Sequence, residues 1–514
     1  MRRLGREVSD EEVVAPSATD VQAVAANSFE PKGLEVFSRQ AAAYRCRIWV
    51  NNQVAGSGVL VSYRLVLTAW HVVNRKTPWD AAQPPRIEIL TSDRRRLAAR
   101  LAGPFSDCHP DEWDDGDIPD ADLAGHHDFV LLRLFEPVGY SLGYLDIPAA
   151  AAVWAGVIAC VLIHYPDGAD QGLTFGQIAY GGPSARYEHV VPTRPGSSGG
   201  ATFSNALEFI GLHQGVIGNR RRLVPAAPYA NDDAFRACLR ADGRPTYLWS
   251  LTRSLNAHLI IGRRTFFDGL DAIVGDSRMV RGIWVRRVDP RREEAGLSFS
   301  FRMLENFLAL RAPEARAVRI DIPTDGSDLF DLIAGVLDDA EPGPARPGVR
   351  RDETTFVAHE RDRADLLVGA LDRRAAPLWL HLEGPSQEPG REMQLQLEQL
   401  VSRLASARNI RTVLTRLEKC HMPVPAYQSL ADAAQRARPG LLLDYVGGFS
   451  RDDVRDLVRV IDSDLGLDLN DGTVEDFVDK ALDEAEEELG RYGSAQLAEV
   501  SERLKSILLP WVPT

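Results

Sequence analysis

The sequence predicts a multidomain protein: a β-rich first half, then a small α/β region and an all-α bundle at the C-terminal end. The 514 residues suffice for three or four domains, and 45% of them are hydrophobic. Short apolar stretches separated by polar turns dominate up to about residue 262. After residue 297 apolar residues recur at helical spacing, and from about residue 439 the chain becomes helical and acidic.

The first half contains several predicted strands. Residues 44–50 form the first, and residues 56–62 and 65–69 form a pair joined by a short polar turn. Residues 129–134 have the composition of a buried strand, and residues 208–215 form another predicted strand.

Three reactive side chains lie beside these strands. His71 follows an apolar strand, Asp128 immediately precedes one, and Ser198 lies in the Pro-Gly-Ser-Ser-Gly-Gly motif of residues 195–200. A nucleophile, a base and an orienting carboxylate are the groups that acyl transfer requires. Glycines on both sides of the serine let the backbone turn tightly and approach a substrate.

With these motifs in this order, the chain resembles the trypsin/chymotrypsin-like serine peptidases over about residues 37–262. The resemblance implies an all-β fold of two barrels. It implies that Ser198 is the nucleophile, His71 the general base and Asp128 the residue that orients the base. The N–H groups of Gly196 and Ser198 would form the oxyanion hole, and no metal or organic cofactor is implied.

Nearby residues of the same types are weaker candidates. Asp120 and Asp122 do not directly precede an apolar strand, and we expect His126 and His127 to lie at the surface. Ser197 is also a hydroxyl, but the family pattern has the nucleophile directly before the glycine pair. The digestive enzymes carry an aspartate at the position of Ser197, which pairs with a newly cleaved amino terminus. That route of activation is therefore not expected here.

The composition favours a cytoplasmic protein. The five cysteines are widely spaced and show no metal-ligand pattern, as expected in a reducing compartment. The polar start is not followed by an apolar run, so we expect no secretory signal. No stretch approaches the roughly 18 apolar residues of a membrane span, so we expect no membrane association.

We expect six segments. They are a mobile N-terminal segment (1–36), the peptidase domain (37–262), an α/β connecting region (263–340), a linker (341–352), a small α/β module (353–437) and an acidic helical domain (438–514). The predicted strands of the second half are 317–322, 354–357, 378–382 and 410–414, and the predicted helices are 301–308, 329–337, 361–373 and 392–407. Within the peptidase domain we expect a surface loop at 107–125, an insertion at 218–245 with a short helix around 232–240, and a closing helix-like run at 252–259.

The end of the chain is strongly acidic. Residues 451–514 contain 7 Lys/Arg and 17 Asp/Glu, a net charge of −10 in a chain whose net charge is −14. Such a balance argues against nucleic acid as a direct ligand, because phosphate binding needs a basic surface. The simplest interpretation is a helical bundle with solvated acidic faces. The architecture also resembles adaptor modules attached to trypsin-like peptidases of bacterial conflict and antiphage systems, which implies a regulatory protein partner at this domain.

The predicted function is an intracellular serine endopeptidase that cleaves protein substrates and is regulated through its C-terminal half, in a bacterial defence or signalling system. One alternative is a catalytically dormant peptidase fold that only binds partners. Another is a protein quality-control peptidase like HtrA, although no PDZ-type segment is recognisable after the peptidase.

The substrate pocket is predicted from positions relative to Ser198. Thr193 would lie at its base, and His213, Gln214 and Gly215 along its wall. No acidic residue occupies positions 192–194, so a preference for Arg or Lys is not expected. The Ile-Gly-Leu-His run resembles glutamyl endopeptidases and some viral cysteine peptidases of this fold, which implies a preference for Glu or Gln. A purely apolar pocket that prefers Leu or Phe is the alternative.

Overall fold

In the computed structural model, the described residues form two compact units, one ending at Gly243 and the other starting at Arg244. The structure describes residues 28–74, 79–113, 118–148, 156–168, 172–180, 184–217, 220–275, 277–289, 297, 299–337, 353–385 and 387–512. The expected linker 341–352 and most of the expected N-terminal segment lie outside the described residues.

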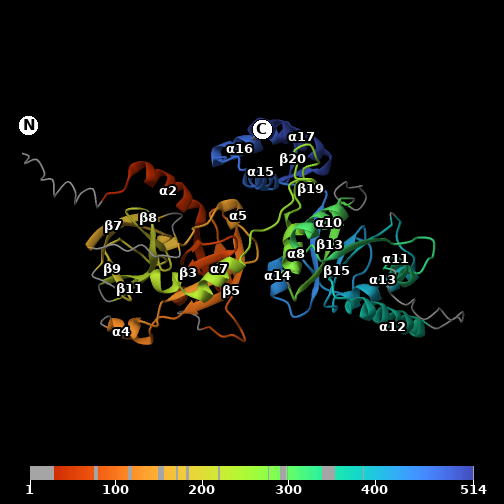
Figure 1. Cartoon of the computed structure of the whole chain (residues 1–514), viewed down its shortest axis with the longest axis horizontal. Helices are drawn as coiled ribbons and strands as arrows, with labels where there is room; N and C mark the ends of the chain where they lie inside the picture. Colours follow the sequence, from red (N-terminus) through yellow and green to blue (C-terminus); the bar gives the residue numbers. More distant parts are fainter. Residues whose placement is uncertain are drawn as a thin grey trace, which may run out of the picture. The chain divides into compact units, whose positions relative to one another are not determined.

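The first unit contains two closed barrels of six antiparallel strands, which confirms the predicted double-barrel fold (Figure 1). The strands of the first barrel are β1 (Arg45–Val50), β2 (Gln53–Leu60), β3 (Leu65–Thr68), β4 (Ile87–Leu90), β5 (Arg96–Ser106) and β6 (Phe129–Leu134). Those of the second are β7 (Gly156–His164), β8 (Gly172–Tyr180), β9 (Tyr187–His189), β10 (Ala201–Ser204), β11 (Phe209–Ile217) and β12 (Arg220–Pro225). The expected insertion at 218–245 therefore begins with a barrel strand, β12.

Short helices connect or cover the barrels. They are α2 (Pro31–Tyr44), α3 (Trp70–Asn74), η1 (Pro110–Trp113), α4 (Asp120–Leu123), α5 (Gly139–Leu142), η2 (Pro166–Gly168), α6 (Ala227–Ala230) and α7 (Asp233–Ala241). The last of them confirms the short helix expected around 232–240. Buried residues of both barrels, among them Leu131 of β6 and Phe203 of β10, belong to one hydrophobic core. This shared core fixes the two barrels against each other and so positions residues contributed by each.

The prediction that residues 1–36 form a mobile segment is wrong for the last of them, because helix α2 begins at Pro31. The Glu30 side chain caps this helix by accepting hydrogen bonds from the N–H groups of Lys32 and Gly33. Phe37 and Ala41 are one helical turn apart and both are buried in the barrel core. The helix is therefore held by packing on one face.

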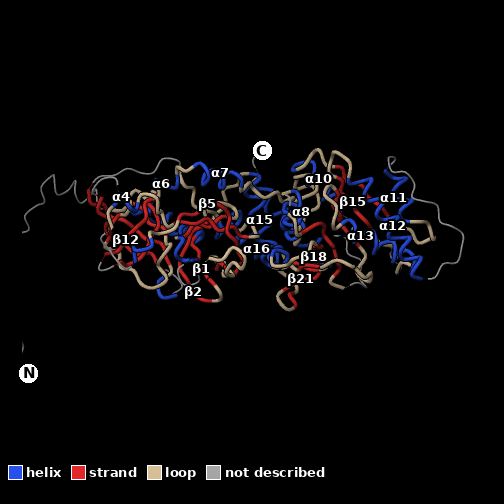
Figure 2. Tube along the Cα trace, turned by 90° about the horizontal axis from the view of Figure 1, so that it is seen from below, coloured by secondary structure: helices blue, strands red, loops and turns tan. Residues whose placement is uncertain are grey.

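The second unit is built on a parallel six-stranded sheet with strand order β14-β15-β16-β13-β18-β17. Its strands are β13 (Val280–Arg287), β14 (Arg316–Asp321), β15 (Leu378–Glu383), β16 (Ile410–Thr415), β17 (Ala426–Tyr427) and β18 (Gly440–Val446). Its helices are α8 (Arg264–Val274), α10 (Ser300–Arg311), α11 (Leu329–Leu337), α12 (Glu353–Asp372), α13 (Arg391–Leu404) and α14 (Leu430–Ala434). Residues of α11, α12 and α13 share one hydrophobic core with the sheet, and residues of α8, α10 and α14 share another, so helices cover both faces (Figure 2).

Three predictions for residues after 250 are wrong. Residues 354–357 lie in helix α12 rather than in a strand, because their apolar residues continue a helical pattern that runs to Asp372. Residues 252–259 form turns rather than a closing helix. Residues 440–446, assigned to the helical domain, form β18 between β13 and β17. A buried parallel strand is a continuous apolar run, which periodicity alone does not distinguish from a buried helix.

The last part of the second unit is helical, with α15 (Arg451–Leu465), α16 (Asp471–Leu482), η3 (Ser494–Gln496), α17 (Leu497–Leu508) and η4 (Leu509–Trp511). A small antiparallel sheet of β19 (Gly448–Phe449), β20 (Glu487–Glu488) and β21 (Arg491–Gly493) accompanies the helices. Helix α15 starts with a capping box between Ser450 and Asp453. None of the helices among the described residues is both long enough and apolar enough to span a bilayer.

Candidate active site

His71 and Asp128 are brought together by neighbouring strands of the first barrel. Helix α3 follows β3 and carries His71, while Asp128 directly precedes β6, which pairs with β3. His71 Nδ1 lies 2.7 Å from Asp128 Oδ2, and the backbone N–H of His71 donates to Asp128 Oδ1 at 3.0 Å. Both side chains are buried. A carboxylate held at two points fixes the orientation of the imidazole ring and the proton on Nδ1.

Ser198 lies between β9 and β10 of the second barrel, and its backbone is held close to helix α3. The N–H of Ser57 donates to the Ser198 carbonyl at 2.7 Å. A Cβ atom on Gly56 would lie 2.6 Å from that carbonyl oxygen and 2.8 Å from a methyl of Val72, the residue after His71. Only glycine at position 56 leaves room for the serine loop beside the helix that carries the histidine.

The loop around Ser198 leaves two N–H groups free. Ser197, Gly199 and Gly200 donate their backbone N–H groups to protein carbonyls at 2.8–3.1 Å. Among the described residues, no protein acceptor meets the N–H of Gly196 or of Ser198. Gly196 has φ of 91° and Gly199 has φ of 80°, values that favour glycine. Two unpaired donors next to a serine hydroxyl are the arrangement that an oxyanion requires.

No hydrogen bond joins His71 to Ser198. In the described part of the chain, His71 Nε2 is buried and has no hydrogen-bond partner. Hydrogen bonds between catalytic groups are often long in ligand-free enzymes and tighten when substrate binds. The aspartate–histidine half of the predicted triad is thus formed, while the bond between histidine and serine is not.

The predicted pocket residue His213 belongs to a pair of histidines. His213 on β11 is buried, and its Nδ1 lies 3.0 Å from Nε2 of His189 on β9. The N–H of Val191 donates to His189 Nδ1 at 3.2 Å. Burial, together with the nearby Arg221, lowers the pKa of His189 to about 4. Burial and the neighbouring His189 hold the pKa of His213 well below its usual value, so both rings are neutral near pH 7.

The other predicted pocket residues have different environments. The hydroxyl of Thr193 is buried and has no partner among the described residues. Gln214 is buried and accepts a hydrogen bond from Arg186 Nε at 3.1 Å, so its side chain is held by that contact. A Cβ on Gly215 would lie 3.9 Å from Ser198 Oγ, which identifies Gly215 as a neighbour of the serine.

Comparison with known families agrees with this geometry. Residues 56–212 match the family model described as "Trypsin-like peptidase domain". The matched span includes His71, Asp128 and Ser198 and ends just before His213. No curated protein matches the chain.

Two similar solved structures are a serine endoprotease from Yersinia pestis and Deg5. The first is 21% identical with a TM-score of 0.31, and the match covers 42% of this chain and 70% of that chain. Deg5 is 16% identical with a TM-score of 0.30, and the match covers 40% of this chain and 98% of that chain.

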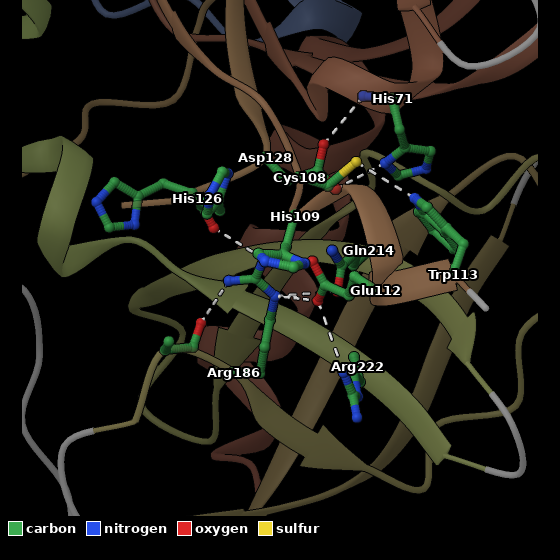
Figure 3. Close-up of polar contacts among 12 residues, drawn as sticks. His71, Cys108, His109, Glu112, Trp113, His126, Asp128, Arg186, Gln214 and Arg222 are labelled. Atoms are coloured by element: carbon green, nitrogen blue, oxygen red, sulfur yellow. Dashed lines mark hydrogen bonds and ion pairs between the residues drawn. The ribbon is translucent and has the colours of Figure 1, made fainter. Parts of the chain in front are cut away.

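One segment of the matched region contributes to the site although the sequence analysis assigned it no role. The expected surface loop 107–125 sends Trp113 into the site, where its ring centroid lies 4.8 Å from that of His71 at an angle of 61° (Figure 3). A Cβ on Gly215 would lie 3.2 Å from the same indole. Trp113 Nε1 donates to Cys108 Sγ at 3.3 Å. Burial, and to a lesser degree Asp128, raises the pKa of Cys108 to about 11, so this thiol stays protonated.

A buried ion cluster anchors this loop to the second barrel. Glu112 is fully buried and accepts two hydrogen bonds from Arg186, at 2.7 and 2.8 Å, and Arg222 lies 3.6 Å away (Figure 3). Arg186 also donates to the backbone carbonyl of His126 at 2.8 Å. In the sequence, the only indication that this loop is anchored is a tryptophan and a glutamate in a segment otherwise rich in Asp, Pro and Gly.

The described residues contain no cluster of three or more His, Cys, Asp or Glu side chains that could hold a metal ion.

Proposed function

We propose that the chain is a serine endopeptidase that works through an acyl-enzyme. Ser198 Oγ attacks the carbonyl carbon of the scissile peptide bond while His71 Nε2 takes its proton. The N–H groups of Gly196 and Ser198 receive the oxyanion, and the amine leaves with the proton held by His71. A water molecule, deprotonated by His71, then hydrolyses the ester on Ser198. Asp128 stabilises the imidazolium at each stage.

The observation that carries this proposal is the buried His71–Asp128 pair beside a serine whose flanking N–H donors are unpaired. The test is hydrolysis of a mixed peptide library by the full chain and by Ser198→Ala. We expect cleavage by the wild-type chain only. Cleavage that persists in Ser198→Ala would mean that another protein or another residue is responsible.

A dormant scaffold is the second candidate, favoured by one observation. His71 Nε2 has no partner among the described residues, and the indole of Trp113 lies against the imidazole. If the loop 107–125 held Trp113 against His71 permanently, the wild-type chain would fail to cleave the peptide library while still binding partners.

We also propose that the pocket prefers Glu or Gln before the scissile bond. Because Val191 N–H donates to Nδ1 of the neutral His189, the proton of that ring is on Nε2. That N–H donates to His213 Nδ1, so the proton of the neutral His213 is on Nε2. His213 thus offers a donor, which suits a carboxylate or amide oxygen and not an ammonium or guanidinium group.

Profiling substrates that differ only in the residue before the scissile bond tests this preference. We expect the wild-type kcat/KM to be at least about 100-fold higher for Glu or Gln than for Leu, because a buried donor is left unpaired by an apolar side chain. His213→Ala should lose this selectivity, while His126→Ala, a histidine outside the pocket, should keep it. A wild-type preference for Arg or Lys, or for Leu or Phe, would contradict the proposal.

We further propose that residues from Arg244 onward regulate the peptidase by binding a protein partner, as in a cytoplasmic bacterial defence or signalling effector. Because Ser197 stands where the digestive enzymes carry the aspartate that pairs with a new amino terminus, we expect the activity to be controlled by something other than cleavage near the N-terminus. A groove of about 550 Å³ between α16 and α17, lined by Phe477, Trp511 and polar residues, supports partner binding at the helical region. Protein quality control of the HtrA type is the alternative role.

Regulation is tested by comparing the full chain with a chain that ends after Gly243, which retains all strands of both barrels. We expect the full chain alone to be at least about 5-fold less active, within the usual range of coupling between domains. Equal and high activity of both proteins would show that the second unit does not restrain the peptidase.

A further inference from the structure

Ser197, the residue before the proposed nucleophile, is the start of a buried hydrogen-bond relay. Its Oγ lies 2.7 Å from Nδ1 of His164, at the end of β7. The other ring nitrogen, Nε2, lies 2.8 Å from Oγ1 of Thr174 on β8. Ser197 and His164 are both buried. Each neutral tautomer of His164 completes both bonds, because each hydroxyl can donate or accept.

The relay also reaches the backbone of the serine loop. The N–H of Arg194 donates to Ser197 Oγ at 3.1 Å, and the N–H of Ser197 donates to the carbonyl of Arg194 at 3.1 Å. These two bonds close the turn from Arg194 to Ser197, which contains Gly196. The orientation of the Gly196 N–H therefore depends on where His164 holds the Ser197 hydroxyl.

The surroundings of His164 are shaped to hold its ring in one place. Gly172 lies opposite His164 in the pairing of β7 and β8. A Cβ on Gly172 would lie 2.9 Å from Cδ2 and from Nε2 of the imidazole, so the ring packs directly on this backbone. A Cβ on Gly200 would lie 2.9 Å from Cβ of His164. Burial, and secondarily Arg45, lowers the pKa of His164 to about 4, so the ring carries no charge near pH 7.

Two further hydrogen bonds hold the serine loop. Neither these bonds nor those of the relay require a charged side chain. Ser57 Oγ donates to the Gly196 carbonyl at 2.7 Å. The N–H of Asp167 donates to the Pro195 carbonyl at 2.7 Å. Because C=O and N–H point in opposite directions in a trans peptide, this bond turns the Gly196 N–H away from Asp167. The loop is thus fixed with its donors free.

We infer that His164 and Thr174 are positioning residues, which hold the oxyanion loop in its active conformation through Ser197. This inference rests on the proposed peptidase function. An uncharged relay takes the place of an ion pair with a new amino terminus. The oxyanion donors are then organised without cleavage of the chain.

The test measures kcat, KM and the inhibition constant of a peptide boronic acid for the full chain. The boronic acid forms a tetrahedral adduct whose oxygen requires the oxyanion donors. The variants are Ser197→Ala, His164→Phe, Thr174→Val and the double variant Ser197→Ala/His164→Phe. Thr202→Val is the matched control, because Thr202 is a buried threonine of the same barrel whose hydroxyl has no partner among the described residues.

We expect Ser197→Ala and His164→Phe to lower kcat by about 10- to 100-fold, with KM little changed. The inhibition constant of the boronic acid should rise by the same factor. The double variant should be no worse than the worse single variant, because the residues act in series. Thr174→Val should lower kcat more than Thr202→Val. This comparison still tests the relay if His164→Phe does not fold. Unchanged kcat in Ser197→Ala, or effects that multiply in the double variant, would overturn the relay. Absence of hydrolysis by the wild-type chain would instead refute the proposed function, and the relay with it.

Discussion

Asp128→Asn is expected to lower kcat for peptide hydrolysis by about 10⁴-fold, and Ser198→Ala and His71→Ala by at least as much. An amide at position 128 donates as well as accepts, so it no longer fixes the proton on His71 Nδ1, and Nε2 loses its role as base. The buried bond of 2.7 Å between Asp128 and His71 is the structural reason for an effect of this size. Steady-state kinetics on one cleaved peptide measures it.

The three residues should act as a unit, so the double variant His71→Ala/Ser198→Ala should be no slower than either single variant. His127→Ala is the matched control for His71→Ala, because His127 is the residue next to Asp128 and has no proposed role. Independent, multiplying losses in the double variant, or a large loss in His127→Ala, would contradict the assignment.

Glu112→Gln is expected to lower the free energy of unfolding of the first unit by about 3–5 kcal/mol. The fully buried Glu112 carboxylate is the counterion for Arg186, and Arg222 lies 3.6 Å from it, so its neutralisation leaves buried positive charge uncompensated. Urea unfolding, followed by tryptophan fluorescence, measures the change.

Asp111→Asn is the control, since Asp111 is the preceding residue in the same loop and is exposed. Its substitution should change the free energy of unfolding by no more than about 0.5 kcal/mol. A similar loss in both variants, or no loss in Glu112→Gln, would mean that the ion cluster does not hold the loop.

The double barrel could be predicted through the family resemblance, and the neighbourhood of His71 and Asp128 also follows from local sequence. A histidine after one apolar strand and an aspartate before another become neighbours as soon as those strands pair, as β3 and β6 do. The glycines around Ser198 mark a loop whose positive φ values other residues rarely adopt. These features can be recognised without knowing the rest of the fold.

The remaining features depend on contacts between segments far apart in the chain. Glu112 and Arg186 are 74 positions apart, and nothing around Glu112 distinguishes it from the exposed acidic residues of its loop. His164 and Ser197 likewise meet only because β7 and β10 are neighbours in the second barrel. Strand β18 was missed because its apolar run follows a charged stretch and precedes a helix, a context in which strand and helix look alike.

The central claim, that Ser198 is an activated nucleophile, is tested most directly by labelling the full chain with a fluorophosphonate probe. Mass spectrometry of the digested protein then locates the adduct. The account predicts a single adduct on Ser198 that is absent from Ser198→Ala and strongly reduced in His71→Ala, while Ser197→Ala is still labelled at a lower rate. An adduct on Ser197, or no labelling of the wild-type chain, would contradict it.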